Sequence, residues 1–248
     1  MSSEKTTAIV LRLIPFSESS YVVTLYSEDF GKITGMAKGA RRAKSAFASA
    51  LDLLSVCRIV FIRKSSDAMD LLTEAALEQP FRAARRDLSR LYGGYYVLEL
   101  IDALTDQRDP NPSLFRTLQE TVKALDSNAN VNSVLVRFEL NALKLLGQLP
   151  SLYDCVECGD RVNSNTRVAF GQTSGGVLCE RCKIGKRHVV SLSLEAIEAI
   201  RQLSNERSAA GFHFSNPNVQ GELRGLMNHY MSHLLGRRPR MFSFMGFP

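Results

Sequence analysis

The cysteine pairs Cys155-Val156-Glu157-Cys158 and Cys179-Glu180-Arg181-Cys182 decide how the second half of this chain folds. Each pair forms a tight knuckle that turns two sulfur atoms toward one point, and the spacer between the pairs is long enough to bring the knuckles together. Four thiolates at this spacing predict a structural Zn²⁺ site with no open position for water. The expected ligands are Cys155, Cys158, Cys179 and Cys182. A disulfide pair, a redox pair and an iron–sulfur cluster are the alternatives.

Length and composition limit the number of domains and the class of protein. The chain has 248 residues, of which 45% are hydrophobic, enough for two or three modest domains. No run approaches the roughly 20 apolar residues of a membrane span, and the N-terminus leads into a strand pattern without a signal peptide. We therefore expect a cytoplasmic protein, where paired CxxC motifs are more typical of metal binding than of disulfides. Cys57 lies in an apolar run and is expected to be buried.

The N-terminal segment predicts a small β-barrel. Five runs rich in apolar and β-branched residues follow one another with no long helix between them. A turn at residues 28–31, with Gly31 free to adopt a positive φ, joins the second and third runs as a hairpin. Residues 1–79 are therefore expected to form a five-stranded OB-fold barrel, with an SH3-like barrel as the alternative. The expected strands are residues 6–13, 21–26, 32–37, 53–62 and 71–77.

After Pro80 the hydrophobic period changes from two to 3.6, which predicts helices. Residues 80–150 are expected to form a helical domain, residues 151–190 a zinc finger, and residues 191–248 C-terminal helices that pack on the helical domain. Gly93-Gly94 interrupts the first helix pattern and indicates close approach of another helix. The fold class is therefore a multidomain α+β protein. The expected helix N-caps are Asp87, Ser113, Asn130 and Asn216.

Few residues indicate catalysis. His229 and His233 have the i, i+4 spacing of a metal pair, but HExxH would need Glu where this chain has Tyr230. Nucleophile-elbow and Walker motifs are also missing. We therefore expect a protein that is not an enzyme.

Positive charge gathers in one loop. The net charge is +6, and residues 32–44 carry five basic residues with no acid. Such a cluster predicts a polyanionic partner, because long cations on a glycine-containing loop can settle on phosphates without reading a sequence. Aromatic side chains on the expected strands could stack on bases or belong to the core. The basic residues are Lys32, Lys38, Arg41, Arg42 and Lys44, and the aromatic residues are Tyr21, Tyr26 and Phe61.

Three stretches together resemble the RecO family of bacterial DNA repair proteins. The first stretch is residues 24–45, TLYSEDFGKITGMAKGARRAKS; the second is residues 138–159, FELNALKLLGQLPSLYDCVECG; the third is residues 175–182, GGVLCERC. The likeness covers nearly the whole chain in order.

The resemblance implies an OB-fold, a helical domain and a zinc element in a recombination mediator. Such proteins bind single- and double-stranded DNA, anneal complementary strands, and act with RecR to place RecA on strands coated by single-strand-binding protein (SSB). The resemblance also implies a cytoplasmic, nucleoid-associated location. The phosphate ligands would be Lys38, Arg41, Arg42 and Lys44, with Lys32 nearby. Arg137 and Lys144 would form the basic rim of a pocket for the SSB tail. A protein-interaction scaffold without direct DNA binding is the main alternative, and a nuclease a weaker one.

Overall fold

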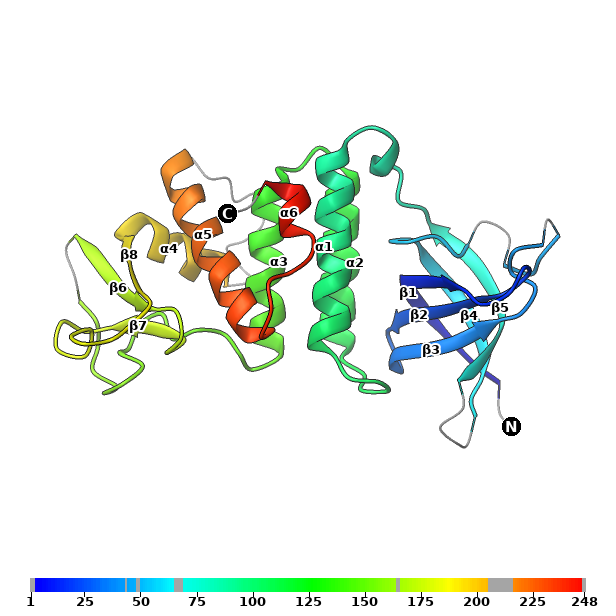
Figure 1. Ribbon diagram of the computed structural model, residues 1–248, viewed down its shortest axis with the longest axis horizontal. Coiled ribbons are helices and arrows are strands. Elements are labelled where there is room, and N and C mark those ends of the chain that lie inside the picture. Colours follow the sequence, from blue (N-terminus) through cyan, green and yellow to red (C-terminus); the bar gives the residue numbers. More distant parts are fainter. Residues whose placement is uncertain are drawn as a thin grey trace. The chain divides into compact units, whose positions relative to one another are not determined.

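A computed structural model describes residues 3–42, 44–47, 50–64, 69–163, 166–204 and 216–246 (Figure 1). The chain divides into two compact units, Met1–Asn128 and Ala129–Pro248. The boundary falls inside residues 80–150, which the sequence presents as one helical domain, and the four-part division stays a prediction. None of the helices in the described ranges is long and apolar enough to cross a membrane.

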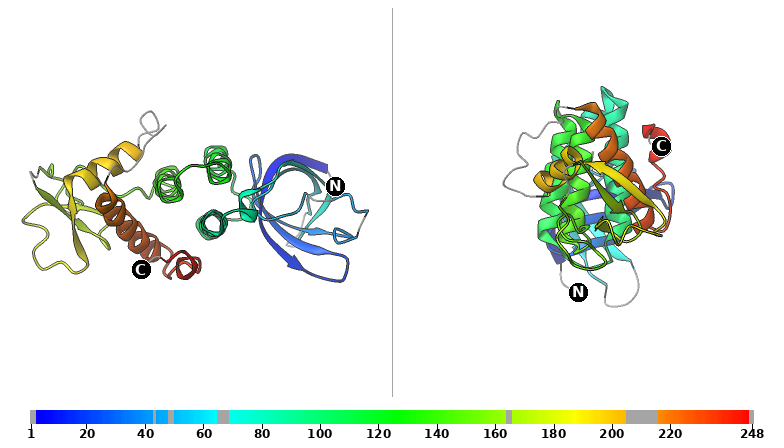
Figure 2. Two further views of the ribbon diagram at one scale, coloured as in Figure 1. Left: turned by 90° about the horizontal axis from the view of Figure 1, so that it is seen from above. Right: turned by 90° about the vertical axis from the view of Figure 1, so that its left-hand side faces the viewer.

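The first unit begins with a closed five-stranded barrel, seen from above in the left view of Figure 2. The strand order is β1-β2-β3-β5-β4, and β4 returns to pair with β1. Only the β3–β5 pair is parallel, and the other pairs are antiparallel. This is the topology of an OB-fold, and it confirms the predicted barrel. The strands are β1 (Ser3–Pro15), β2 (Tyr21–Ser27), β3 (Gly31–Ala37), β4 (Val56–Ile62) and β5 (Asp70–Gln79).

Alternating side chains of these strands fill the barrel interior. Gly31 has a φ of 64° and closes the β2–β3 hairpin as predicted. Cys57 is fully buried, as expected, and burial followed by the charge of Glu78 raises the pKa of its thiol to about 12. The connection between β4 and β5 includes residues 65–68, which lie outside the described residues.

Two helices and a short 3₁₀ turn complete the first unit. Asp87 caps α1 as predicted, because its carboxylate accepts from the backbone N–H of Ser89. The cap of α2 is Asn111 and not Ser113: the Asn111 side chain accepts from Leu114 N at 3.0 Å. Pro112 fits the first position of α2 because that position needs no N–H donor. The elements are η1 (Ala83–Arg85), α1 (Leu88–Leu104) and α2 (Pro112–Asp126).

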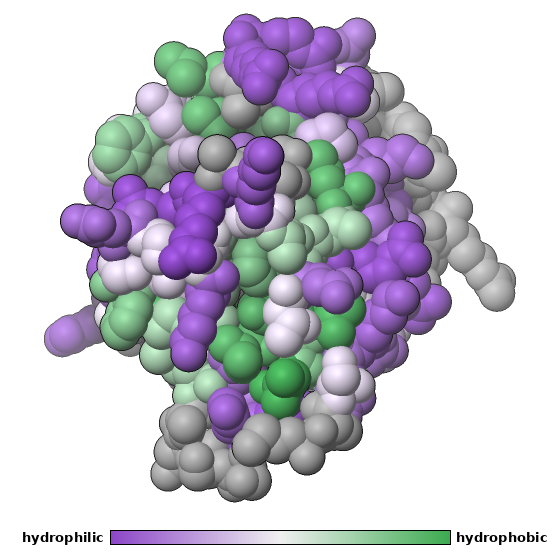
Figure 3. Space-filling model, turned by 90° about the vertical axis from the view of Figure 1, so that its right-hand side faces the viewer, coloured by the Kyte–Doolittle hydropathy of each residue, from purple (hydrophilic) through white to green (hydrophobic). Residues whose placement is uncertain are grey.

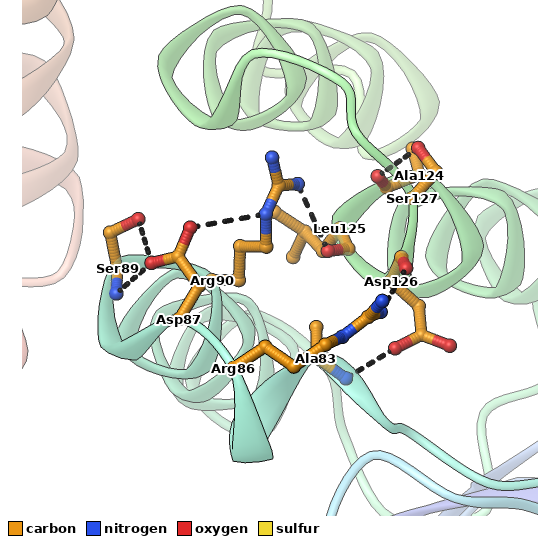
Figure 4. A network of polar contacts seen from close by, with 9 residues as sticks. All are labelled: Ala83, Arg86, Asp87, Ser89, Arg90, Ala124, Leu125, Asp126 and Ser127. Atoms are coloured by element: carbon orange, nitrogen blue, oxygen red, sulfur yellow. Dashed lines mark hydrogen bonds and ion pairs between the residues drawn. The ribbon is translucent and has the colours of Figure 1, made fainter.

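A polar network fastens the end of α2 to the start of α1 (Figure 4). The Asp126 carboxylate accepts from the backbone N–H groups of Arg82 at 2.8 Å and Ala83 at 2.5 Å. Arg90 donates to the Leu125 carbonyl at 3.2 Å. A cation at a helix C-terminus interacts favourably with the helix dipole. The network therefore holds η1, α1 and α2 as one body.

The barrel and these helices are joined along β3. Lys32 O accepts from Arg108 N at 2.9 Å, so the α1–α2 loop runs beside the first residues of β3. A Cβ on Gly31 would lie 2.1 Å from Asp109 O. Only glycine fits here, both for this close approach and for its positive φ. The Tyr26 ring of the barrel lies 6.4 Å from the Phe115 ring of α2.

Gly94 lets the barrel approach α1, which corrects the expectation of a neighbouring helix. A Cβ at Gly94 would lie 2.5 Å from Cδ1 of Leu54, a residue of the β3–β4 connection. Leu54 is 1% exposed and has a positive φ of 66°. The approaching group is therefore a loop leucine, which helical periodicity could not reveal.

The second unit contains three strands and four helices among its described residues. Strands β6 and β7 pair antiparallel, as do β6 and β8, in the order β7-β6-β8. Asn130 caps α3 and Asn216 caps α5, as predicted. The elements are α3 (Val131–Leu145), β6 (Arg167–Gly171), β7 (Gly176–Leu178), β8 (Val189–Ser193), α4 (Leu194–Leu203), α5 (Pro217–Leu234) and α6 (Phe242–Met245).

Both α4 and α5 pack against α3. A buried ion pair joins α3 to α5: Arg224 Nη2 lies 2.5 Å from Glu139 Oε1. Arg224 also donates from Nε to the Asn228 side chain at 2.7 Å. Removing one partner of such a pair would leave a buried charge without compensation, so we expect the pair to help hold α5 against α3.

Replacing Gly94 with Ala should destabilise the first unit by about 1–3 kcal/mol, because the new methyl group overlaps Leu54. Chemical denaturation followed by circular dichroism measures the change. Gly225→Ala is the control, since no atom lies within 4 Å of a Cβ there, and it should be neutral or stabilise by up to about 1 kcal/mol. Equal effects of the two substitutions would contradict the packing argument.

Candidate functional site

The four predicted cysteine ligands come together in the second unit. The sulfur atoms of Cys155, Cys158, Cys179 and Cys182 all lie within 4.8 Å of one another. Cys158 Sγ and Cys179 Sγ are 3.8 Å apart. Tetrahedral coordination with Zn–S bonds of about 2.3 Å separates sulfurs by about 3.8 Å. The donor set is therefore one that could hold a metal ion.

Both knuckles use the same turn to aim their sulfurs. Gly159 N donates to Cys155 O at 2.8 Å, and Lys183 N donates to Cys179 O at 3.1 Å. Gly159 has a φ of 77° and Gly185 a φ of 74°, a conformation that glycine adopts without strain. The two CxxC pairs thus share one turn hydrogen bond, whereas the positive φ falls directly after Cys158 in the first knuckle and three residues after Cys182 in the second.

Hydrogen bonds within the knuckles shift the pKa values of the four thiols in both directions. Burial opposes the charged form of Cys155, but backbone N–H groups of Cys179, Cys158 and Glu157 donate to its sulfur and lower its pKa to about 6. Hydrogen bonds with Cys179 and Cys158 raise the pKa of Cys182 to about 12. Four sulfurs at this separation repel one another as thiolates unless a cation lies between them. A metal cation bound by the four sulfurs would supply that charge.

Tyr153 anchors the first knuckle to α4. The guanidinium group of Arg161 lies 4.7 Å from the centre of its ring, and that of Arg201 lies 4.2 Å from it. Arg201 also donates to Leu152 O at 2.7 Å. The metal-binding segment is therefore attached to the helices of its own unit through cation–π contacts and a hydrogen bond.

An open cavity of about 850 Å³ lies beside the second knuckle, between it and β6 and β8. Four cations line it, and each forms an ion pair with a carboxylate. The pairs are Arg161–Asp154, Arg167–Glu222, Arg181–Asp160 and Lys183–Glu180. Positive charge around this cavity is therefore balanced locally.

Four of the predicted basic residues lie on the β3–β4 connection. Lys38, Arg41, Arg42 and Lys44 are all exposed, and none of them forms an ion pair with a carboxylate in the described part of the chain. Figure 3 views the barrel side of the first unit, where hydrophilic side chains gather around a more apolar centre. We call the four residues Lys38, Arg41, Arg42 and Lys44 the basic loop. Among the described residues its cations have no carboxylate partner, unlike the cations around the cavity of the second unit.

The β1–β2 turn, residues 16–20, holds the start of the basic loop. Arg41 N donates to Ser19 O at 3.0 Å, and Arg41 Nη1 donates to Ser17 O at 2.8 Å. Gly39 N donates to the Ser20 hydroxyl at 3.3 Å. The Arg41 guanidinium lies 5.6 Å from the centre of the Tyr21 ring. Arg41 therefore has a defined position at this end of the barrel.

Lys32 does not join the basic loop. It is 7% exposed, its Nζ donates to Asp102 O at 2.6 Å, and the same Nζ lies 3.5 Å from the Asp102 carboxylate. A lysine held in this way cannot also contact a phosphate, so the predicted binding role does not fit this geometry. Charge counting placed Lys32 in the cluster, but its position on β3 gives it a structural role.

The predicted stacking aromatics are mostly core residues. Tyr26 and Phe61 are 0% exposed, so neither ring can receive a base. Tyr21 is half-buried beneath Arg41. Phe16, which the sequence analysis did not select, is 64% exposed on the β1–β2 turn. Its position directly after Pro15, at the end of a strand, is the signal that could have identified it.

Arg137 and Lys144 both lie on α3, seven residues and therefore about two turns apart on one face. Arg137 is half-buried, whereas Lys144 is exposed and donates to Ser204 O, at the end of α4, at 3.3 Å. Their role as the rim of a partner pocket stays a prediction.

The histidines of α5 do not build a metal site. The His229 ring stacks on that of His188 at 5.9 Å. Burial, followed by the charges of His188 and His233, lowers the pKa of His229. Within the described ranges, the four cysteines are the one group of three or more metal-ligating side chains close enough to share an ion.

Replacing Cys158 or Cys182 with Ser should abolish stoichiometric metal binding, because three thiolates no longer close the tetrahedron. Elemental analysis measures the metal, and limited proteolysis should then cut faster within residues 151–190. Cys57→Ser is the matched control and should keep the metal, since Cys57 lies in the barrel. Full metal content in the Cys182 variant would refute the four-ligand site.

Lys32→Met should lower the stability of the first unit by about 1–3 kcal/mol, because Asp102 O and its carboxylate lose a buried donor. Lys38→Met, on the exposed loop, should change stability by less than about 0.5 kcal/mol. Denaturant titration of both variants distinguishes the structural lysine from the surface one. If Lys32→Met left the stability unchanged, Lys32 would again be a candidate for contact with phosphate.

Two family models match consecutive parts of the chain: "Recombination protein O N terminal" over residues 1–81 and "Recombination protein O C terminal" over residues 85–241. The chain is 38% identical to the DNA repair protein RecO of Rhodopirellula baltica, over 96% of this chain and 97% of that protein. It is 32% identical to the RecO of Myxococcus xanthus, over 96% of this chain and 95% of the relative. The chain therefore belongs to the RecO family of DNA repair and recombination proteins.

Proposed function

We propose that this protein is a recombination mediator that binds single- and double-stranded DNA through the basic loop and anneals complementary strands. The observation that carries the proposal is the set of four exposed cations without carboxylate partners at one end of an OB-fold barrel, within the described part of the chain. OB-folds bind oligonucleotides with their loops and the face of strands 2 and 3. Membership of the RecO family supports DNA as the polyanion.

Binding would rest mainly on phosphate contacts. Arg41 would be the fixed contact, because the β1–β2 turn already holds its guanidinium. Lys38, Arg42 and Lys44 would adapt to neighbouring phosphates. If each of the four cations meets one phosphate, the slope of log K against log salt on single strands would be about −3. Such contacts carry no sequence information, as a protein acting on any damaged site requires.

Annealing would then follow from charge screening alone. Two strands repel each other through their phosphates, and a cationic surface lowers that repulsion while the bases stay available for pairing. This activity needs neither a nucleotide nor a catalytic residue. We therefore propose a mediator without a catalytic centre.

The metal and the protein partners complete the proposal. Zn²⁺ is the ion that suits four thiolates in a tetrahedron, and it would act as a structural clamp in the second unit. RecR and the acidic tail of SSB would be protein partners, with Arg137 and Lys144 as candidate contacts for the tail. Together they would give RecA access to SSB-coated strands at the nucleoid in the cytoplasm.

Replacing Arg42 and Lys44 with Ala should weaken binding to single strands and make the salt slope shallower by about 1.4, the share of two phosphate contacts. Arg41 is left in place so that the loop keeps its attachment to the β1–β2 turn. The control removes two exposed cations of α2, Arg116 and Lys123, and should bind like the parent protein. Fluorescence anisotropy at several salt concentrations measures both effects.

Annealing of SSB-coated complementary strands tests the function itself. The parent protein and the Arg116/Lys123 control should anneal the strands, and the Arg42/Lys44 variant should anneal them more slowly. A parent protein that binds no DNA at low salt would instead favour an interaction scaffold. A loop variant with unchanged affinity and salt slope would exclude the loop as the binding surface.

A further inference from the structure

Phe16 is the most exposed aromatic side chain of the described first unit, and its place beside the basic loop calls for an explanation. Its ring is 64% exposed, although contact with water costs an aromatic side chain free energy. We infer that Phe16 is a stacking site for one unpaired base of a strand whose phosphates lie on the basic loop. The inference rests on the proposed DNA-binding function and adds a preference for single strands.

Strand register places the ring on the outer side of the barrel. Pro15 pairs with Tyr21, and both Tyr21 and Leu13 pack against the barrel core. Side chains alternate along a strand, so Ile14 points outward, and it is 45% exposed. Phe16 continues this outward series by one more step. The ring is therefore presented to solvent by the strand and does not fill a gap in the core.

The turn that carries Phe16 is closed by hydrogen bonds. Phe16 N donates to Ser20 O at 3.0 Å, and Ser17 N donates to the same oxygen at 3.5 Å. The neighbouring residues Ser17 and Ser19 accept the two hydrogen bonds of Arg41. An aromatic platform and a phosphate ligand thus belong to one hydrogen-bonded unit, which is the pairing that single-strand-binding surfaces use.

The chemistry of the surroundings favours a nucleic-acid base over a protein. Among the described residues 3–42, Ile14 and Phe16 are the exposed large hydrophobic side chains, and they lie beside a serine-rich turn, whereas protein-binding patches span several hundred Å². Glu18 is the one acid of the turn, against four cations of the basic loop. A phosphate-bearing ligand with a flat apolar face matches this combination of charge and ring.

Stacking on Phe16 would distinguish single strands from duplexes. In a duplex the faces of each base are covered by its neighbours, whereas an unpaired base can turn one face to the ring. The pairing edge of a base held in this way stays open. Phe16 would therefore hold a strand in a form that is ready to meet its complement.

The test compares the affinity of three labelled probes: a single strand, a duplex, and an abasic strand of equal length. Phe16→Ala should weaken binding to the base-containing single strand by roughly 5-fold to 100-fold, the range found for base–aromatic stacking. Binding to the duplex and the abasic strand should change by less than about twofold, with an unchanged salt slope, since no phosphate contact is lost. Phe16→Tyr should keep the affinity of the parent protein.

Phe244→Ala is the matched control, because Phe244 in α6 is 62% exposed against 64% for Phe16. It should leave all three affinities unchanged. A Phe16→Ala variant that binds the single strand like the parent, or that loses equally on all three probes, would overturn the inference. If Phe16→Ala gives one of these results while the Arg42/Lys44 variant loses affinity for the same probes, only the stacking role of Phe16 fails. If the parent binds no probe at low salt, the proposed DNA-binding function fails first.

Discussion

Closure of the barrel by the parallel β3–β5 pair is the constraint on which the rest of the first unit depends. Gly35, Met36 and Ala37 pair in register with Asp70, Leu71 and Leu72. This pairing removes the open edge that a five-stranded sheet would expose. It also fixes where β3 ends, and the basic loop leaves the barrel directly after Ala37. The position of the cations is thus a consequence of strand pairing.

Charge is distributed differently in the two units. The cations around the cavity of the second unit each face a carboxylate. The ion pair between Arg224 and Glu139 is buried and joins two helices. The basic loop lacks such partners within the described residues, so its cations are available to an external anion. Local charge balance, more than net charge, therefore distinguishes the proposed binding surface from the paired cations of the second unit.

The metal site and the barrel could be predicted from sequence because both depend on local signals. A CxxC pair sets its own knuckle, and alternation sets a strand. Lys32, Tyr26 and Gly94 could not be assigned in this way, because their roles depend on residues far away in the chain. Asp102 binds the lysine, Phe115 lies beside the tyrosine, and Leu54 occupies the space that the glycine leaves. Composition identified the basic loop, but only burial could show which cations reach solvent.

The close contact at Gly31 has a consequence for how this protein can be divided. The α1–α2 loop lies against the glycine, and Leu54 is inserted against α1. A fragment ending at residue 79 would uncover these surfaces and leave Lys32 without its carbonyl partner. The smallest piece that keeps its own core therefore extends through α2, near Asn128. Barrel and helices share one compact unit, so we expect the barrel without these helices to lose stability.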